Sequence, residues 1–208
     1  MSRSKSSARW LKQHFNDPFV KRAQQEGLRS RSAYKLLELQ EKYKLIKPGM
    51  TVVDLGAAPG GWSQVVTRFV GKLGKVYALD ILAMPGLPDV DFLQGDFREE
   101  SVLHALLARI PEQKADLILS DMAPNLSGNR SIDQPRAMYL AELVLDFGQR
   151  VLKPKGVLLI KAFQGAGFEA YLQLLRQNFQ SVSIRKPTAS RQGSAEVYLI
   201  ARGYRPPF

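Results

Sequence analysis

The 208-residue sequence predicts an α/β fold: a seven-stranded, mostly parallel sheet with one antiparallel strand and helices on both faces. From residue 51 onward, short apolar segments alternate with helical segments, which indicates parallel strands joined by right-handed crossovers. The last two apolar segments are separated only by a short stretch containing Pro, Ser and Gly, which is typical of a hairpin and makes one strand antiparallel. With 45% apolar residues, a chain of this length can bury one sizeable core, so we expect a single domain.

The expected strands are short apolar runs that end in turn residues, at 51–55, 75–80, 90–93, 116–120, 156–162, 181–186 and 195–201. The expected helices between them cover 60–71, 99–109, 134–152 and 167–178.

Two more helices are expected before the sheet. Asp17-Pro18 is typical of an N-cap followed by proline at the first helical position, and this helix should end near Gly27. Ser30 or Ser32 should begin a second helix that runs to about Lys44. Residues 1–14 are rich in serine and basic residues and are predicted to be a flexible basic leader, which leaves 15–208 as the single domain.

The net charge of +11 is concentrated near the amino terminus. The first 50 residues hold 12 Lys/Arg and 4 Asp/Glu, a net charge of +8, and the remaining residues hold 18 and 15, a net charge of +3. A basic segment in front of a nearly balanced domain indicates a polyanion such as nucleic acid as partner. The alternative is a solvated basic face that only maintains solubility.

Composition also excludes several classes of protein. The chain has no cysteine and only two histidines, which excludes disulfides and thiolate metal sites and argues against a histidine-rich metal site. It has no apolar run of 18 residues and no signal-peptide core. We therefore expect a cytoplasmic protein with no membrane span and no metal.

The segment from Val52 to Trp62 reads as a buried strand, a glycine-rich turn and the start of a helix. This arrangement holds a nucleoside-bearing cofactor at the carboxyl end of a parallel strand, where glycine lets the backbone approach the ligand closely. The segment lacks the G-x-G-x-x-G spacing of dehydrogenases, and no G-K-[ST] of a P-loop follows. It resembles the first motif of S-adenosylmethionine (SAM) methyltransferases, which implies SAM as cofactor and a Rossmann-like SAM-dependent methyltransferase fold.

Three carboxylates are expected at the ends of successive strands behind this turn. Asp54 lies in the first strand, Asp80 ends the second, where it could accept hydrogen bonds from ribose hydroxyls, and Asp96 follows the third, where it could accept from an adenine amino group. A single aspartate at a strand end is often only a helix cap, but three in succession favour a cofactor site. Trp62 could pack against the cofactor or lie in the core. The candidate SAM-binding residues are Asp54, Gly56, Gly60, Trp62, Asp80, Asp96 and Asp121.

Further polar residues interrupt or flank the apolar strands. Asp121 follows the fourth strand, Glu196 precedes the apolar part of the last strand, and Lys161 interrupts the fifth. A buried lysine is costly unless it is paired, so Lys161 needs either a functional partner or a path to solvent. Lys35 is expected on the second helix, next to Tyr34.

With these residues the chain resembles the FtsJ/RrmJ family of ribosomal RNA 2′-O-ribose methyltransferases over nearly its whole length. The resemblance implies a catalytic set of Lys35, Asp121, Lys161 and Glu196. It also implies a uridine in the A-loop of 23S ribosomal RNA as target, in the assembled 50S subunit. The motifs that carry it are Gly27–Arg31, Tyr34–Leu36, Asp54–Gln64, Phe92–Phe97, Ser120–Asn125, Ser127-Gly128, Lys161–Gly165, Arg185–Pro187 and Ser190-Arg191.

Two roles are open for Lys161 at this point. A ribose hydroxyl must lose a proton while it attacks a methyl group held in line. A nearby cation such as Lys35 would favour neutral Lys161 as the proton acceptor. Asp121 and Glu196 would instead favour the charged lysine, which would orient the hydroxyl and stabilise the developing negative charge.

A basic surface could hold the RNA through its phosphates. Related reactions remain as alternatives: methylation of transfer RNA or of an mRNA cap, and methylation of a base nitrogen, although Asp121–Pro124 lacks the usual Asn/Asp-Pro-Pro-aromatic motif. A non-catalytic RNA-binding assembly factor is an alternative from another class. The candidate RNA-binding residues are Arg29, Arg31, Lys35, Arg185, Lys186 and Arg191.

Overall fold

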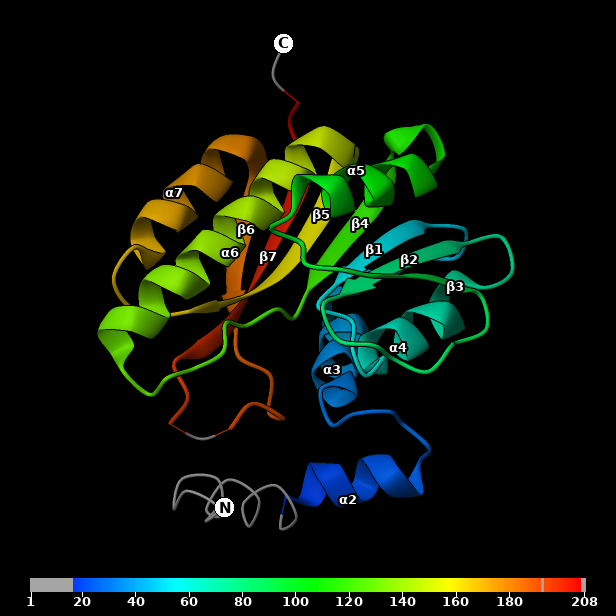
Figure 1. Ribbon diagram of the computed structural model, residues 1–208, viewed down its shortest axis with the longest axis horizontal. Helices are drawn as coiled ribbons and strands as arrows, with labels where there is room; N and C mark the ends of the chain where they lie inside the picture. The colour runs from blue at the N-terminus through cyan, green and yellow to red at the C-terminus, as the bar shows by residue number, and fades with distance from the viewer. Residues whose placement is uncertain (1–16, 192, 207–208) are drawn as a thin grey trace.

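The computed structural model describes residues 17–191 and 193–206, so the flexible leader expected at 1–14 lies outside the described residues. Seven strands form one sheet in the order β3-β2-β1-β4-β5-β7-β6 (Figure 1). The elements are α2 (Pro18–Gln25), α3 (Ala33–Tyr43), β1 (Thr51–Leu55), α4 (Gly61–Val70), β2 (Lys75–Asp80), β3 (Val90–Gln94), α5 (Glu100–Arg109), a 3₁₀ turn (Pro111–Gln113), β4 (Ala115–Ser120), α6 (Arg130–Val151), β5 (Leu152–Phe163), α7 (Phe168–Asn178), β6 (Phe179–Arg185) and β7 (Glu196–Tyr204).

The strand directions confirm the predicted sheet. Strands β1 to β5 are all parallel to one another, whereas β7 is antiparallel to its two neighbours, β5 and β6. The predicted hairpin is therefore the β6–β7 pair. From β1 the sheet grows through β2 to β3 on one side and through β4 on the other. The point between β1 and β4, where the order reverses, is where open α/β sheets bind their ligands.

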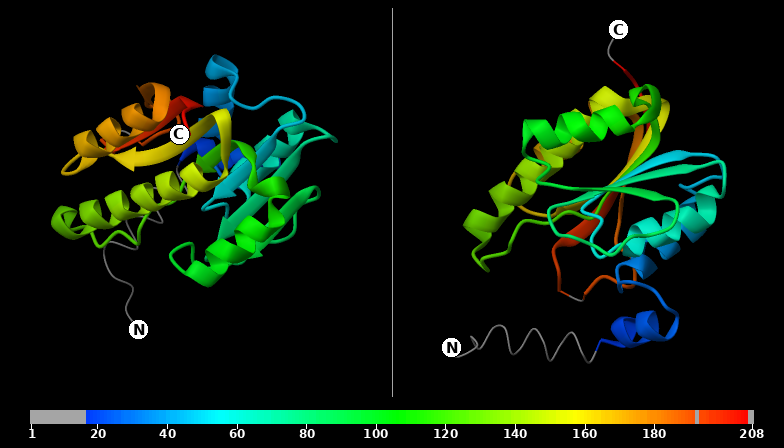
Figure 2. Two further views of the ribbon diagram at one scale, coloured as in Figure 1. Left: turned by 90° about the horizontal axis from the view of Figure 1, so that it is seen from above. Right: turned by 45° about the vertical axis from the view of Figure 1, so that its right-hand side comes forward.

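Helices cover both faces of the sheet (Figure 2). Because side chains alternate along a strand, Val52 joins the core under α3 and α4, and Val53 joins the core under α5, α6 and α7. Both valines are fully buried, as expected for a central parallel strand. None of the helices in residues 17–191 and 193–206 has the length and apolar content needed to span a membrane.

Helix α6 begins earlier than the sequence pattern predicts. The expected start was residue 134, but the helix begins at Arg130, because the Asn129 side chain accepts a hydrogen bond from the backbone N–H of Ser131 at 3.1 Å. Proline favours the first helical turn, so Pro135 points to a later start. The cap at Asn129 leaves Pro135 inside the helix instead.

Strand β5 also begins earlier than expected, at Leu152 rather than 156. Leu152 pairs with Ala115, but the next pair is Val157 with Leu117, so the residues between them form a bulge on β5. Lys155 in this bulge has a positive φ of 66°. Proline and a left-handed residue normally indicate a turn, which hides the short first part of the strand from sequence analysis.

Candidate active site

The predicted site residues come together at the edge where the parallel strands end. Asp121 follows β4 directly, and its backbone N–H donates to the carbonyl of Leu55 at 3.2 Å, at the end of β1. Lys161 lies near the end of β5. Glu196 is at the same edge because β7 runs antiparallel and begins there. Lys35 reaches this edge from the first turn of α3.

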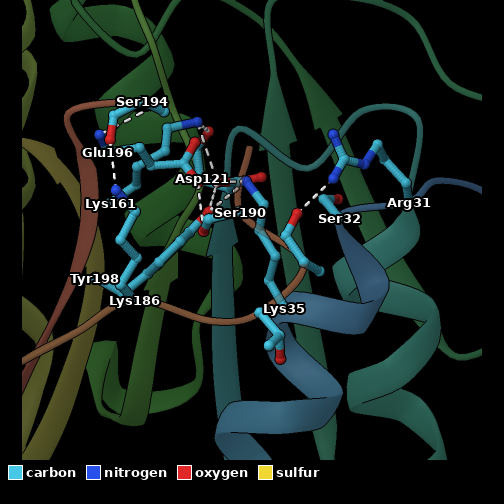
Figure 3. Close-up of polar contacts among 12 residues, drawn as sticks. Arg31, Ser32, Lys35, Asp121, Lys161, Lys186, Ser190, Ser194, Glu196 and Tyr198 are labelled. Atoms are coloured by element: carbon cyan, nitrogen blue, oxygen red, sulfur yellow. Dashed lines mark hydrogen bonds and ion pairs between the residues drawn. The ribbon is translucent and has the colours of Figure 1, made fainter. Parts of the chain in front are cut away.

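A continuous series of hydrogen bonds and ion pairs links the four predicted catalytic residues (Figure 3). The Lys161 Nζ atom lies 3.0 Å from Asp121 Oδ1 and also donates to the Asp121 backbone carbonyl. The Lys35 ammonium contacts Glu196 Oε1 at 2.6 Å. The hydroxyl of Tyr198 joins the two pairs, because it donates to Asp121 Oδ1 at 2.7 Å and accepts from Lys35 at 3.1 Å.

Tyr198 is the member of this polar series that sequence analysis does not predict. Its sequence pattern is that of a core residue in an apolar strand, and it is fully buried. Its ring lies 5.8 Å from that of Trp62, and burial raises the pKa of its hydroxyl well above the usual value. The available signal was spacing: residues two apart on a strand share a face, so Tyr198 follows Glu196. It also lies opposite Lys161 on β5.

The charged side chains of this site are largely shielded from solvent. The side chains of Lys35 and Glu196 are 11% and 13% exposed, and that of Lys161 is 9% exposed. Ser190, in the β6–β7 connection, adds a hydrogen bond to Glu196 Oε1 at 3.1 Å. Charges held in such surroundings interact more strongly than charges in water, which suits them to fixed orientation and charge stabilisation.

The glycine-rich turn lies beside this polar series, between β1 and α4. Gly56 has a φ of +79°, and a side-chain carbon there would lie 2.6 Å from Met122 Cγ, next to Asp121. Gly60 has a φ of +101° and would meet Leu87 and Arg29 in the same way. Glycine adopts these backbone conformations without strain and has no side chain to clash, so the backbone can pass close to the residues on either side.

Asp54 lies beneath this turn and is fully buried. Its Oδ2 accepts a hydrogen bond from Ser63 at 2.7 Å, whereas its Oδ1 has no partner among the described residues. The pKa of this carboxyl is raised to about 7, mainly by burial and also by the negative charges of Asp121 and Asp80, while the hydrogen bond from Ser63 opposes the rise. A buried carboxylate oxygen without a partner indicates room for a donor that the protein does not supply.

Asp80 and Asp96 lie at the ends of neighbouring strands, as predicted. The Asp80 carboxylate accepts hydrogen bonds from the backbone N–H groups of Ala58 and Leu82 at 2.9 and 2.8 Å. The bond from Ala58 connects the glycine-rich turn to the end of β2. Asp96 pairs with Arg98, whose hydrogen bonds lower the pKa of the Asp96 carboxyl.

Comparison with known proteins gives the same assignment as the fold and the site. The family of FtsJ-like methyltransferases matches residues 28–204. The chain belongs to the FtsJ-like methyltransferase family.

Relatives of this FtsJ-like methyltransferase match it along almost its full length. It is 59% identical to a protein of Pseudomonas paraeruginosa named ribosomal RNA large subunit methyltransferase E. The match extends over 205 residues and covers 99% of each chain. A protein of Alcanivorax borkumensis with the same name is 59% identical over 202 residues, 97% of each chain. A crystal structure described as a ribosomal RNA methyltransferase from Plasmodium falciparum superposes with a TM-score of 0.78 at 29% identity, covering 86% of this chain and all of that one.

The structure of this methyltransferase places Trp62 in the core. The side chain is 2% exposed, and its Nε1 donates to the backbone carbonyl of Ser32 at 2.9 Å. Of the two roles considered for Trp62, these contacts support packing between α3, α4 and β7.

The predicted RNA-binding residues differ in how much of each side chain reaches solvent. Arg29 donates to the carbonyls of Pro85 and Gly86 at 2.5 and 2.7 Å and so links the segment before α3 to the loop after β2. Arg31 pairs with Asp17 at 2.8 Å, and only 15% of its side chain is exposed.

The other predicted RNA-binding residues lie in or beside the β6–β7 connection. The guanidinium of Arg185 lies 5.0 Å from the Tyr43 ring, so this side chain is also engaged within the protein. Lys186 and Arg191 are exposed. Lys35 belongs to the buried polar series described above.

Proposed function

We propose that this methyltransferase transfers a methyl group from SAM to the 2′-hydroxyl of a uridine in the A-loop of 23S ribosomal RNA. The observation that supports it most is the series Lys161–Asp121–Tyr198–Lys35–Glu196 beside a glycine-rich turn. The names of the full-length relatives support large-subunit ribosomal RNA as the substrate. We further propose that the assembled 50S subunit is the substrate in the cytoplasm.

The residues around the glycine-rich turn fit SAM. The ionised Asp54 carboxylate has an oxygen for a cationic amino group, since Oδ1 has no partner within the described part of the chain. Asp80 and Asp96 have carboxylate oxygens for ribose hydroxyls and an adenine amino group. A side chain at Gly56 would fill space beside Met122. When bound, SAM supplies a methyl group already activated by its sulfonium.

Lys161 then holds the substrate hydroxyl. An ammonium group has three N–H donors, and two of those of Lys161 are directed at oxygens of Asp121. The third remains for the 2′-oxygen, where positive charge stabilises the negative charge that develops as the hydroxyl proton passes to solvent water. Lys35 contacts Glu196 and Tyr198 rather than Lys161, so this geometry favours the orienting role over the general-base role.

The test is methyl transfer from labelled SAM to large ribosomal subunits from a strain that lacks the modification, followed by digestion and identification of the nucleoside. We expect a single 2′-O-methyluridine with the wild-type protein. Lys161→Ala should lower the rate about 100-fold or more while SAM still binds. Lys75→Ala, an exposed lysine at the other end of the sheet, is the control and should react normally.

Four results would contradict the proposal. Near-normal turnover by Lys161→Ala would remove the assigned role of this lysine. A methylated base would identify a base methyltransferase, and a product only on transfer RNA would change the substrate. Tight RNA binding without SAM binding would support the assembly factor.

A further inference from the structure

A second basic site lies at the opposite edge of the sheet from the candidate active site. A groove of about 350 Å³ opens there, between the α3–β1 connection, the bulge of β5 and the end of β7. Its basic lining residues are Lys44, Lys47, Lys153, Lys155 and Arg202, and its only acidic one among the described residues is Asp116. We call these five basic residues the distal basic groove.

The single carboxylate does not neutralise this groove. Asp116 contacts Lys153 Nζ at 2.9 and 3.0 Å and accepts the backbone N–H of Thr51 at 2.8 Å. Lys44, Lys47 and Lys155 are exposed, and within residues 17–191 and 193–206 none of them forms an ion pair. Three positive charges therefore face solvent around one groove.

The backbone gives a second, independent indication that these lysine side chains have a use. Lys44 and Lys155 have φ angles of +50° and +66°, in the left-handed region. Glycine occupies this region without strain, whereas a residue with a Cβ atom is less stable there by about 1 kcal/mol or more. Lys44 caps the carboxyl end of α3 in the left-handed conformation, and helices commonly carry glycine where they end in this way. Local folding therefore favours glycine at both positions.

We propose that the distal basic groove binds the phosphodiester backbone of ribosomal RNA, at a site separate from methyl transfer. Lysine ammonium groups bind phosphate as point charges and release counterions from RNA. No described lining residue is aromatic, so the groove offers no platform for stacking bases. The groove would therefore contribute affinity and orientation but no sequence readout.

The distance between the two sites defines the RNA that they could share. Lys155 and Lys161 lie six residues apart on β5, or about 20 Å along a strand. A folded RNA could present its target nucleotide at one edge of the sheet and a second backbone segment at the other. This inference rests on the proposed function only in taking ribosomal RNA as substrate.

The experiment compares the wild-type protein with the triple variant Lys44→Gln/Lys47→Gln/Lys155→Gln. Binding is measured to protein-free 23S ribosomal RNA and to large subunits over a range of salt concentrations, together with methyl transfer. We expect affinity for both to fall about tenfold and the salt dependence of binding to decrease by about two to three phosphate equivalents. KM for large subunits should rise, while kcat and SAM affinity stay at wild-type values.

Two controls separate charge from other effects. The triple variant with arginine at the same positions keeps the charge and should bind RNA like the wild type. Lys72→Gln/Lys114→Gln removes two exposed lysines outside the groove and should change affinity less than twofold. An equal loss in the arginine variant would indicate a structural effect and overturn the proposal.

Two further outcomes would also overturn it. Unchanged affinity of the glutamine variant would show that the groove does not contact RNA. Weaker binding to subunits with unchanged binding to protein-free RNA would identify a ribosomal protein as the partner. Failure of the proposed function is distinguishable from both, since it would appear in the wild-type protein as a different methylated nucleoside or no transfer.

Discussion

The hydroxyl of Tyr198 connects two ion pairs that come from four different elements. It donates to Asp121 and accepts from Lys35, so it orients the acidic partner of Lys161 and the basic partner of Glu196 together. Because burial raises the pKa of this hydroxyl, it stays protonated at neutral pH and remains a donor to Asp121. We therefore expect Tyr198 to act as a positioning residue.

Replacing Tyr198 by phenylalanine should therefore lower kcat about tenfold or more with little change in the affinity for SAM. The unfolding free energy should fall by about 1–3 kcal/mol, because buried polar groups lose a partner. Tyr204→Phe is a matched control, since Tyr204 is a buried tyrosine on the same strand whose hydroxyl donates to the Gln149 carbonyl. Steady-state kinetics and denaturation of both variants test this, and equal losses of kcat would argue against a positioning role.

Asp54 makes the stability of the SAM-free protein depend on pH. Its pKa is about 7 in the folded chain and 3.8 without the fold, so between these values only the folded chain holds the proton. Tighter proton binding by the folded state means that the unfolding free energy decreases as pH rises from about 4 to about 7. The decrease is on the order of 4 kcal/mol for this group.

Asp54→Asn should remove this contribution, because asparagine does not titrate. The variant should gain stability relative to the wild type as pH rises through this window, and it should bind SAM more weakly. Chemical denaturation at pH 5, 6, 7 and 8 gives the difference between the two proteins and cancels the other titrating groups. A difference that stays constant with pH would exclude a raised pKa at Asp54.

Sequence information was sufficient to predict the four candidate catalytic residues separately but not to predict how they are connected. Lys35, Asp121, Lys161 and Glu196 were predicted from a family resemblance, and the structure brings them together. Tyr198 was missed because a tyrosine within an apolar strand has the same pattern as a core residue. Its role depends on the pairing of β7 with β5, which sequence periodicity does not specify.

The elements show a similar division. Strand directions followed from alternating segments and one short connection, and they are confirmed. The starts of α6 and β5 were placed too late, because Pro135 and the bulge at Lys155 carry turn signals inside regular elements. A side-chain cap and pairing with β4 override these local preferences, and both depend on tertiary structure.

The turn between β1 and α4 depends on glycine for two separable reasons, conformation and space. Gly56→Ala adds both a left-handed alanine and a clash with Met122, whose backbone nitrogen would lie 3.0 Å from the new carbon. At the other end of α4, Gly71 has a φ of +65° and a ψ of −168°, and no atom lies within 4 Å of an added side-chain carbon, so Gly71→Ala adds backbone strain without a clash. The two variants therefore separate strain from crowding.

We expect Gly71→Ala to lower the unfolding free energy by about 1–3 kcal/mol and to leave activity intact. Gly56→Ala should lower it by about 1–3 kcal/mol more and weaken SAM binding, because the backbone must move beside the active site. Denaturation and SAM titration check both values. Equal losses of stability would mean that Met122 shifts without cost.

At the scale of the whole molecule, the segment before the sheet docks onto the last hairpin and completes the site. Lys35 and Glu196 are 161 positions apart in the chain, yet they form an ion pair. Nearby, Glu38 accepts the backbone N–H of Thr188 at 2.7 Å. The candidate catalytic residues are therefore assembled by long-range contacts, and folding of the hairpin and of α3 should be coupled through this pair.

A double-mutant cycle on Lys35 and Glu196 measures that coupling. Lys35→Met leaves a buried carboxylate without its cation, and Glu196→Gln leaves a buried ammonium without its anion, so each single variant should lose about 3–5 kcal/mol of unfolding free energy. The double variant carries neither charge and should recover most of this loss. The exposed pair Arg150–Asp146 is the control, with an expected coupling below about 1 kcal/mol.

Methyl transfer should follow a different pattern from stability in the same cycle. The double variant should remain as inactive as the single variants, because the restored fold still lacks the two groups that contact Tyr198 and Ser190. Additive losses of stability would show that the pair does not couple α3 to β7. Recovery of activity together with stability would show that Lys35 and Glu196 serve the fold alone.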